Sequence, residues 1–396
     1  MTEPVLPEGE EPQEKQFTRR QVVKAGLIGS AAVAGASLAG GVAKAASKSA
    51  ARSSANTLNV FTWSSYHDAP WIKEYEKKRG VKVNLQVTGS VPDMFAKTKA
   101  DPGAYDLVLA TAGWIENYVD ADLIIPFDDY KKTIPNSRNI SPLFPWRKAT
   151  TYKGHNWALV YNWGDEPLCW LPSKVHPEPN SWNVLYDPKY KGRVSLVDDP
   201  TTILPFIGLM LGFKDPYHMT SAEFKAWKKK LMDLRRQLTH VTASIDDQTA
   251  DFANGQVEIG VLYNISTLVK LNQQGIPLKQ KIPREGTPTW SDNYTITKAS
   301  GAKKLDLVHD FINYTLSVPW QARFIATSAN TGNISLSLAR SQEAIKAGLT
   351  PKKLNATLQP YTAGGASFFR KLSLLRRVPN LDDWLNAWNE FKLGLG

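Results

Sequence analysis

Six residues beside predicted strand ends could together bind an organic ammonium ion. Trp63, Tyr66, Tyr263 and Trp290 could supply ring faces, and Asp199 and Asp292 could supply negative charge. An ammonium ion over a tryptophan face gains about 0.5 to 2 kcal/mol when water is excluded. A charge-assisted hydrogen bond to a carboxylate adds to this attraction. This set of side chains predicts a site that selects a small cation.

Ordinary packing could also account for several of these side chains. Trp63 and Tyr66 could fill the space between a sheet and the helix that follows it, and Tyr263 could belong to a core. Asp199 stands before Pro200, where a carboxylate often caps a turn or a helix. For these residues the sequence alone leaves the structural and the ligand-binding interpretations open.

The sequence contains no familiar catalytic or cofactor motif. It has no G-x-S-x-G elbow, P-loop, H-E-x-x-H pair or glycine-rich dinucleotide turn, and its six histidines have no metal-ligand spacing. We therefore expect a protein that is not an enzyme and that holds no cofactor and no metal. Two alternatives stay open: an enzyme assembled from distant segments, and ferric-ion capture through Tyr66 and His67.

Alternating strands and helices are predicted to position the first group of candidates. The pattern predicts a strand from Leu58, a helix over 68–79, a strand over 81–87, a helix over 91–100 and a strand over 105–110. In an open α/β sheet, ligands bind outside the carboxyl ends of the strands. Residues 63–66 and 111–113 should therefore face a cleft.

A second α/β set is expected after a crossing strand at 157–161. Its predicted elements are strands over 192–197 and 257–263, a helix that begins with the capping box Thr220-Ser-Ala-Glu223, and a return crossing over 286–294. Helices over 303–316 and 381–392 complete the α/β fold. We assign residues 57–160 and about 292–340 to a first lobe, and residues 161–291 and about 341–396 to a second. Phe368 could place another side chain at the cleft.

The first 45 residues are predicted to be a twin-arginine export signal. Arg19 and Arg20, followed by Lys24, lead into an uncharged run of small residues that ends at Ala43-Lys-Ala45. This arrangement predicts the twin-arginine translocase as a partner and the periplasm as the destination. Residues 46–56 would be a flexible leader. A membrane anchor is the alternative, but the run is less apolar than a spanning helix usually is.

The composition argues against a nucleic-acid partner and excludes an intramolecular disulfide. The net charge is +11, yet the basic residues are scattered and no nucleic-acid module accompanies them, so we expect a solvated basic surface and no nucleic acid. Cys169 is the single cysteine, which excludes an intramolecular disulfide.

From about residue 57 to 330 the sequence resembles the periplasmic solute-binding proteins of ABC importers, in the spermidine/putrescine-binding branch. The resemblance runs through 58–66, 103–108, 181–199, 255–263 and 290–292. It implies a monomer with two α/β lobes joined by crossing hinge strands, which closes on its ligand and delivers it to permease subunits. It also places ligand contacts on Ser64 and Thr111, besides Trp63, Asp199, Tyr263, Trp290 and Asp292.

Two departures from the family pattern bear on the ligand. Thr202 stands where a polyamine binder tends to have glutamate, and Gly113 stands where an aromatic residue is expected. One carboxylate fewer weakens the case for a long polyamine, because a buried ammonium without a partner is costly. The resemblance therefore implies a small amine: a polyamine, a diamine or an opine-like cation or zwitterion.

Overall fold

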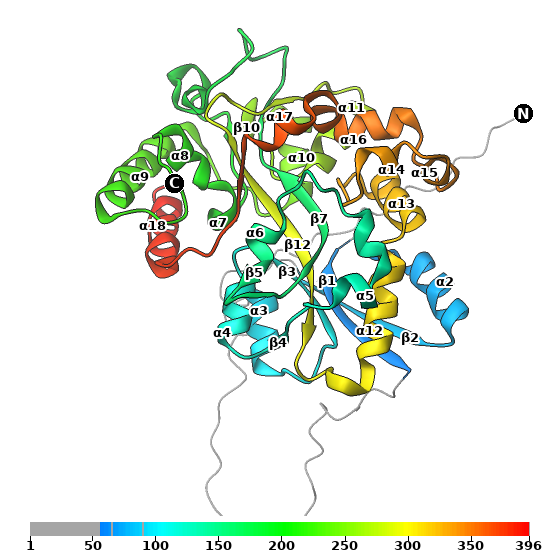
Figure 1. Ribbon diagram of the computed structural model, residues 1–396. Helices are drawn as coiled ribbons and strands as arrows, with labels where there is room; N and C mark the ends of the chain where they lie inside the picture. The colour runs from blue at the N-terminus through cyan, green and yellow to red at the C-terminus, as the bar shows by residue number, and fades with distance from the viewer. Residues whose placement is uncertain (1–55, 65, 89–90, 396) are drawn as a thin grey trace, which may run out of the picture. The chain divides into compact units, whose positions relative to one another are not determined.

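A mixed β-sheet built around the long strand β12 (Thr287–Thr297) organises the fold (Figure 1). Its strand order is β13-β12-β3-β1-β2, and β4 and β7 also pair with β12. Strand β1 (Thr57–Trp63) runs parallel to β2 (Lys82–Thr88) and β3 (Leu107–Thr111), whereas β12 is antiparallel to β3 and to β7 (Leu159–Asp165). The three predicted parallel strands and the return crossing are confirmed.

The structure is a computed structural model that describes residues 56–64, 66–88 and 91–395. These described residues form one compact unit. The predicted export signal, and the predicted leader apart from Asn56, lie outside the described residues. Across the described ranges, no helix is both long enough and apolar enough to cross a membrane.

The helices that connect the first strands follow the sequence signals. Helix α2 (Ala69–Arg79) has Pro70 in its first turn and ends at Gly80, whose φ of 67° is the left-handed conformation that glycine adopts readily. Asp68 occupies the N-cap position, but its side chain makes no capping hydrogen bond. Helices α3 (Val91–Ala100) and α12 (Gly301–Thr315) match the predicted ranges closely.

A second sheet has the order β11-β8-β10-β9 and shorter strands than predicted. Its strands are β11 (Lys279–Lys281), β8 (Leu168–Trp170), β10 (Ile259–Val261) and β9 (Val194–Ser195). Helix α9 (Ser221–Leu234) begins with the complete capping box of Thr220 and Glu223, as predicted. Helix α18 (Leu381–Leu393) buries Trp384, Trp388 and Phe391, so its aromatic side chains serve packing.

The other helices and strands lie between these along the chain. They are α4 (Ile115–Asp120), β4 (Ile124–Ile125), α5 (Tyr130–Thr133), α6 (Arg147–Thr150), β5 (Thr151–Tyr152), β6 (His155–Asn156), α7 (Pro200–Ile203), α8 (Pro205–Met210), α10 (Ile245–Ala253), α11 (Ile265–Gln273), α13 (Val318–Ser328), α14 (Leu336–Ala339), α15 (Gln342–Lys346), α16 (Pro351–Gly364), α17 (Ala366–Phe369) and β13 (Leu372–Leu374). Four 3-10 turns cover Pro135–Asn139, Trp182–Tyr186, Pro188–Tyr190 and Arg235–Gln237.

Strands β7 and β12 link two hydrophobic cores. Tyr294 of β12 lies in a core with Tyr161 of β7, whereas Trp290, four residues earlier on β12, lies in a core with Trp182 and Trp227. One strand thus contributes to both cores, as a crossing strand should. Figure 1 shows β7 and β12 running side by side through this region.

The C-terminal segment packs differently from the predicted division into lobes. We assigned 341–396 to the second lobe, but Leu349, Leu354 and Leu358 lie in the first core, and β13 joins the first sheet. Only the end of the segment, with helix α18, packs in the second core. Residues 340–380 carry no periodic signal strong enough to indicate their packing partner, and the division into two lobes stays a prediction.

Close packing of the backbone leaves no room for a side chain at Gly260 on β10. A Cβ atom at this position would lie 2.5 Å from the carbonyl oxygen of Ser195 on β9. We expect Gly260→Ala to lower the free energy of unfolding by about 1 to 3 kcal/mol, because a backbone atom cannot move aside cheaply. Urea unfolding would measure the change. The matched control is Gly103→Ala, whose Cβ would make ordinary contact at 3.6 Å; equal midpoints for both variants would contradict the prediction.

Candidate functional site

Asp292 on β12 is a buried carboxylate held by two hydroxyl groups. The Thr111 hydroxyl donates to its Oδ1 atom at 2.6 Å, and the Tyr66 hydroxyl donates to its Oδ2 atom at 2.5 Å. Thr111 lies opposite Asp292 because β3 and β12 are paired there. Burial raises the pKa of Asp292 to about 6, and repulsion from Asp199 adds to this, although the two hydroxyls oppose it. The structure therefore brings together three of the predicted site residues.

Tyr66 is fixed by groups from two other strands, β7 and β12. Its hydroxyl accepts a hydrogen bond from the Asn162 amide at 3.0 Å, and its main-chain oxygen accepts one from Tyr161 at 2.8 Å. The Asn162 amide also donates to Asn330 at 3.0 Å. Asn330 in turn accepts a 3.5 Å bond from Asn264, the N-cap residue of α11. This chain of amides links the surroundings of Asp292 to the part of the fold that carries Asp199 and Tyr263.

Asp199 has the capping role that the sequence left open, and its ligand-binding role stays a prediction. It caps helix α7 by accepting from the Thr202 main-chain nitrogen at 3.3 Å. Its Oδ2 atom also accepts from the Tyr263 hydroxyl at 2.9 Å and from the Thr202 hydroxyl at 2.7 Å. Burial raises the pKa of Tyr263 well above its usual range, and Asp199 and Glu166 reinforce this shift, so its hydroxyl keeps its proton and donates.

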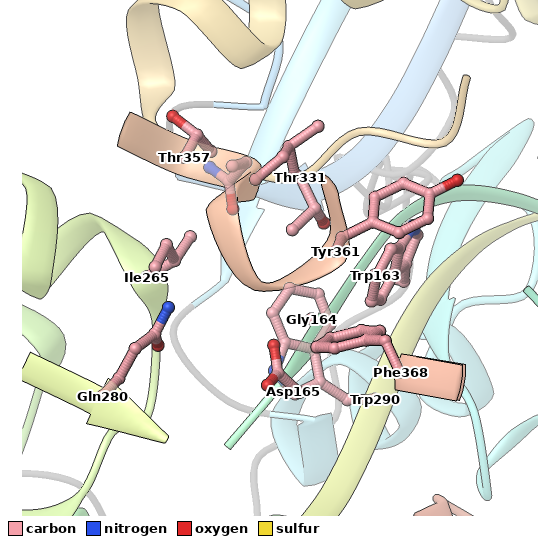
Figure 2. Close-up of a pocket in the computed structure, with 12 residues that line it drawn as sticks. Trp163, Gly164, Asp165, Ile265, Gln280, Trp290, Thr331, Thr357, Tyr361 and Phe368 are labelled. Carbon is pink, nitrogen blue, oxygen red and sulfur yellow. The ribbon is translucent and has the colours of Figure 1, made fainter. Parts of the chain in front are cut away.

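Trp290 borders a pocket (Figure 2). Its indole lies directly on Gly164, where a Cβ atom would be 2.5 Å from the ring carbon Cζ2. The bare backbone of Gly164 thus lets the ring lie close to β7. Asp165, Tyr361 and Phe368 line the same pocket. The contribution of Phe368 to a ligand cleft stays a prediction.

Trp63 and Ser64 lie apart from these contacts. The Trp63 indole nitrogen donates to the Leu109 oxygen at 3.1 Å, and its ring packs against two core clusters. Ser64 is exposed in the turn after β1. In the described ranges neither residue is hydrogen-bonded to Asp292 or Asp199. Their ligand-binding roles stay a prediction, and the contacts of Trp63 are those of a packing residue.

Sequence reasoning missed Asp165 and Glu166 at the end of β7. Burial raises the pKa of Asp165 to about 7. Burial also raises the pKa of Glu166 well above its usual range, with repulsion from Asp199 and Asp165 as further causes. Asp165 is the last residue of a strand, as Thr111 is, and Glu166 comes directly after it. That placement is a signal that could have identified them, but the strand was expected to end at Tyr161.

The proposed ferric-ion ligands are engaged in other contacts. The two ring nitrogens of His67 face the hydroxyls of Thr62 at 2.9 Å and Tyr294 at 2.8 Å. Burial lowers the pKa of His67 to about 3, which makes it a neutral core histidine. In the described part of the chain, no group of three or more His, Cys, Asp or Glu side chains could hold a metal ion.

The sequence pattern of bacterial extracellular solute-binding proteins matches residues 70–351. The chain belongs to this family. This match confirms the resemblance noted from the sequence.

Individual relatives in the family are periplasmic proteins. Spermidine/putrescine-binding periplasmic protein 1 of Haemophilus influenzae is 26% identical over 292 residues, which cover 73% of this chain and 78% of that protein. The spermidine/putrescine-binding periplasmic protein of Escherichia coli is 28% identical over 265 residues, covering 66% and 73%.

A solved structure supports the fold. The spermidine/putrescine ABC transporter substrate-binding protein PotD of Streptococcus pneumoniae has a TM-score of 0.67 and 19% identity, and the match covers 86% of this chain and 100% of that one. The predicted two-lobed α/β fold of periplasmic binding proteins is therefore confirmed.

Proposed function

We propose that this protein is the substrate-binding component of an ABC importer and that it captures a small amine near Asp292, Asp199 and Trp290. The observation that carries the proposal is a group of carboxyl side chains that lie near one another without a cationic partner among the described residues. Asp199 repels both Glu166 and Asp292, and Asp165 also repels Glu166. Among the described residues, no lysine, arginine or histidine forms an ion pair with any of these four carboxyl groups. Buried carboxylates without a cationic partner favour a cationic ligand.

The chemistry of capture follows from the groups around Asp292. An ionised Asp292 would accept charge-assisted hydrogen bonds from an ammonium group, while the hydroxyls of Thr111 and Tyr66 hold the carboxylate in place. The Trp290 indole offers a face to the apolar part of the ligand. Relatives named for spermidine and putrescine binding support this ligand class.

Closure of the lobes would complete the site and commit the ligand to transport. The amides of Asn162, Asn330 and Asn264 connect β7 to the start of α11, so movement about β7 and β12 would remake these contacts. We propose delivery of the loaded monomer to permease subunits from the periplasm, after export by the twin-arginine route. Cell fractionation would test the export step.

A panel of small amines tests the proposed function. A ligand at about a hundred times its Kd stabilises the folded state by about 2.7 kcal/mol, which should raise the Tm by roughly 5 °C. Differential scanning fluorimetry with mono-, di- and polyamines and opines would measure the shift. Stabilisation by ferric ion and by no amine would contradict the proposal, and turnover of a bound amine would favour an enzyme.

A further inference from the structure

Another pocket lies in the chain segment between β4 and β5. Its walls come from α5, the 3-10 turn Pro135–Asn139, the loop that follows this turn and the start of α6. The cavity measures about 630 Å³, which lies within the range of about 300 to 1,000 Å³ that small-molecule sites usually have. Residues other than those around Asp292 line it, so the proposed capture of an amine does not account for this pocket.

The charged side chains among the lining residues are all basic. They are Lys131, Arg138, Arg147 and Lys148. The sequence contains no aspartate or glutamate between Asp129 and Asp165. Within the described ranges, no carboxylate forms an ion pair with any of these four side chains. The positive charge of the pocket therefore favours an anionic ligand.

Two aromatic rings hold the Arg147 guanidinium in place. Its central carbon lies 5.8 Å from the ring centroid of Tyr130 and 5.4 Å from that of Trp146. Its Nη2 atom donates to the Tyr130 hydroxyl, and the guanidinium makes no other hydrogen bond to a described residue. A guanidinium carries five N–H donors in a planar fork that suits phosphate and carboxylate oxygens. Donors of a fixed cation thus remain for a ligand.

Two neutral donors in the pocket wall also lack partners. Ser137 is 8% exposed and Trp146 is 7% exposed, and both line the pocket. In the part of the chain that the structure describes, neither the Ser137 hydroxyl nor the Trp146 indole N–H is hydrogen-bonded. A largely buried donor without a partner costs free energy. The oxygens of a bound anion would supply the missing acceptors.

The rest of the wall is apolar. Ile140, Pro142, Phe144 and Pro145 line it. Phe144 is buried, and its ring stacks on that of Trp163 with 4.8 Å between the centroids, so this part of the wall is fixed. Cations beside an apolar wall suit an anion that also carries an apolar group.

We propose that this pocket binds an organic phosphate, with the phosphate oxygens on Arg147 and the apolar part of the molecule against Phe144 and Trp146. Four cations and two neutral donors offer more than the two oxygens of one carboxylate can use. A phosphate monoester presents three terminal oxygens and carries a charge of about −1.5 to −2 at neutral pH. The phosphate belongs either to a soluble ester or to the headgroup of a phospholipid. This site is independent of amine capture.

Calorimetric titration at constant ionic strength with phenyl phosphate, inorganic phosphate and phenol tests the ligand class. Phenyl phosphate should bind about tenfold or more tightly than inorganic phosphate, because its ring is buried against the apolar wall. Phenol lacks the charge and should bind more weakly than phenyl phosphate. Equal affinities for phenyl phosphate and inorganic phosphate, or no binding of phenyl phosphate to the protein or of phosphate-bearing vesicles, would overturn the proposal.

Two arginine variants separate this pocket from general attraction to a basic protein. Arg147→Gln should weaken phenyl phosphate binding about tenfold or more, the effect of one lost charge-assisted hydrogen bond. Arg236→Gln removes the same charge from an exposed arginine outside the pocket and should leave binding unchanged. Equal losses in both variants would overturn the site. Arg138→Gln gives a second test should Arg147→Gln not fold, and an amine that stabilises the parent should stabilise these variants equally.

Vesicles of phosphatidylglycerol and of phosphatidylcholine distinguish the two sources of phosphate. Cosedimentation with phosphatidylglycerol alone, lost in Arg147→Gln and kept in Arg236→Gln, would assign the pocket to a lipid headgroup. Binding of phenyl phosphate without cosedimentation would assign it to a soluble ester.

Discussion

Replacing Asp292 by asparagine is expected to remove most of the affinity for the amine ligand. The carboxylate is buried and is oriented by Thr111 and Tyr66, so an ammonium group that binds it would form a desolvated charge pair. Removing one member of such a pair costs about 2 to 5 kcal/mol, because the other charge is left unpaired. The Kd should rise by about 30-fold to several thousandfold. Calorimetric titration of the tightest-binding amine would measure it.

The fold should survive this substitution. Asparagine keeps the size of the side chain, and its carbonyl oxygen can still accept a hydrogen bond from one of the two hydroxyls. The control is Asp198→Asn, because Asp198 adjoins Asp199 in sequence but is exposed and accepts hydrogen bonds from Trp388 and Lys392. That variant should bind the amine as the parent does. Wild-type affinity in Asp292→Asn would place the ligand elsewhere.

Local patterns were enough to predict the elements that carry the site. The apolar runs before Trp63 and around Leu107 predicted parallel strands, and Gly80 marked the end of the helix between them. The role of Trp63 could not be determined in this way, because a tryptophan after a strand suits both a cleft and a core. Its contact with the Leu109 oxygen depends on the distance between two strands, which no local pattern reports.

The meeting of Asp292 with Thr111 and Tyr66 depends on long-range pairing. The hydroxyls of Thr111 and Tyr66 are 181 and 226 residues away from Asp292 in sequence. Strand β12 joins the sheet antiparallel to β3, and the register of that pairing decides which residue lies opposite Thr111. Asp165 and Glu166 were missed for a related reason: β7 continues to Asp165 through polar residues that its pairing with β12 keeps in the strand.

The affinity for the amine is expected to fall steeply as the pH is lowered from 8 to 5. Burial raises the pKa of Asp292 to about 6 and that of Asp165 to about 7. An alkylammonium with a pKa near 10.4, like that of lysine, stays charged throughout this range. Protonation of the protein therefore controls binding. Over this range the Kd should rise about tenfold if Asp292 alone must ionise and about a thousandfold if Asp165 must ionise too.

The stability of the unliganded protein should change with the opposite sign. The folded-state pKa values of Asp292 and Asp165 lie above the unfolded value of about 3.9, so the folded state binds more protons between about pH 4 and pH 7. The stability linked to these groups is fully present below about pH 4 and is lost as the pH rises through 6 and 7. Urea unfolding without ligand, at constant ionic strength, would measure this loss.

Asp165→Asn separates the two contributions to the pH dependence of binding. Without the Asp165 carboxyl, the change in Kd between pH 8 and pH 5 should shrink to about tenfold, the effect expected of Asp292 alone. A parent affinity that stays constant between pH 5 and pH 8, or that rises on acidification, would contradict this account. Because protonation stabilises the empty fold but weakens ligand binding, stability and affinity must diverge over the same pH interval. A general loss of folding in acid would instead lower both together.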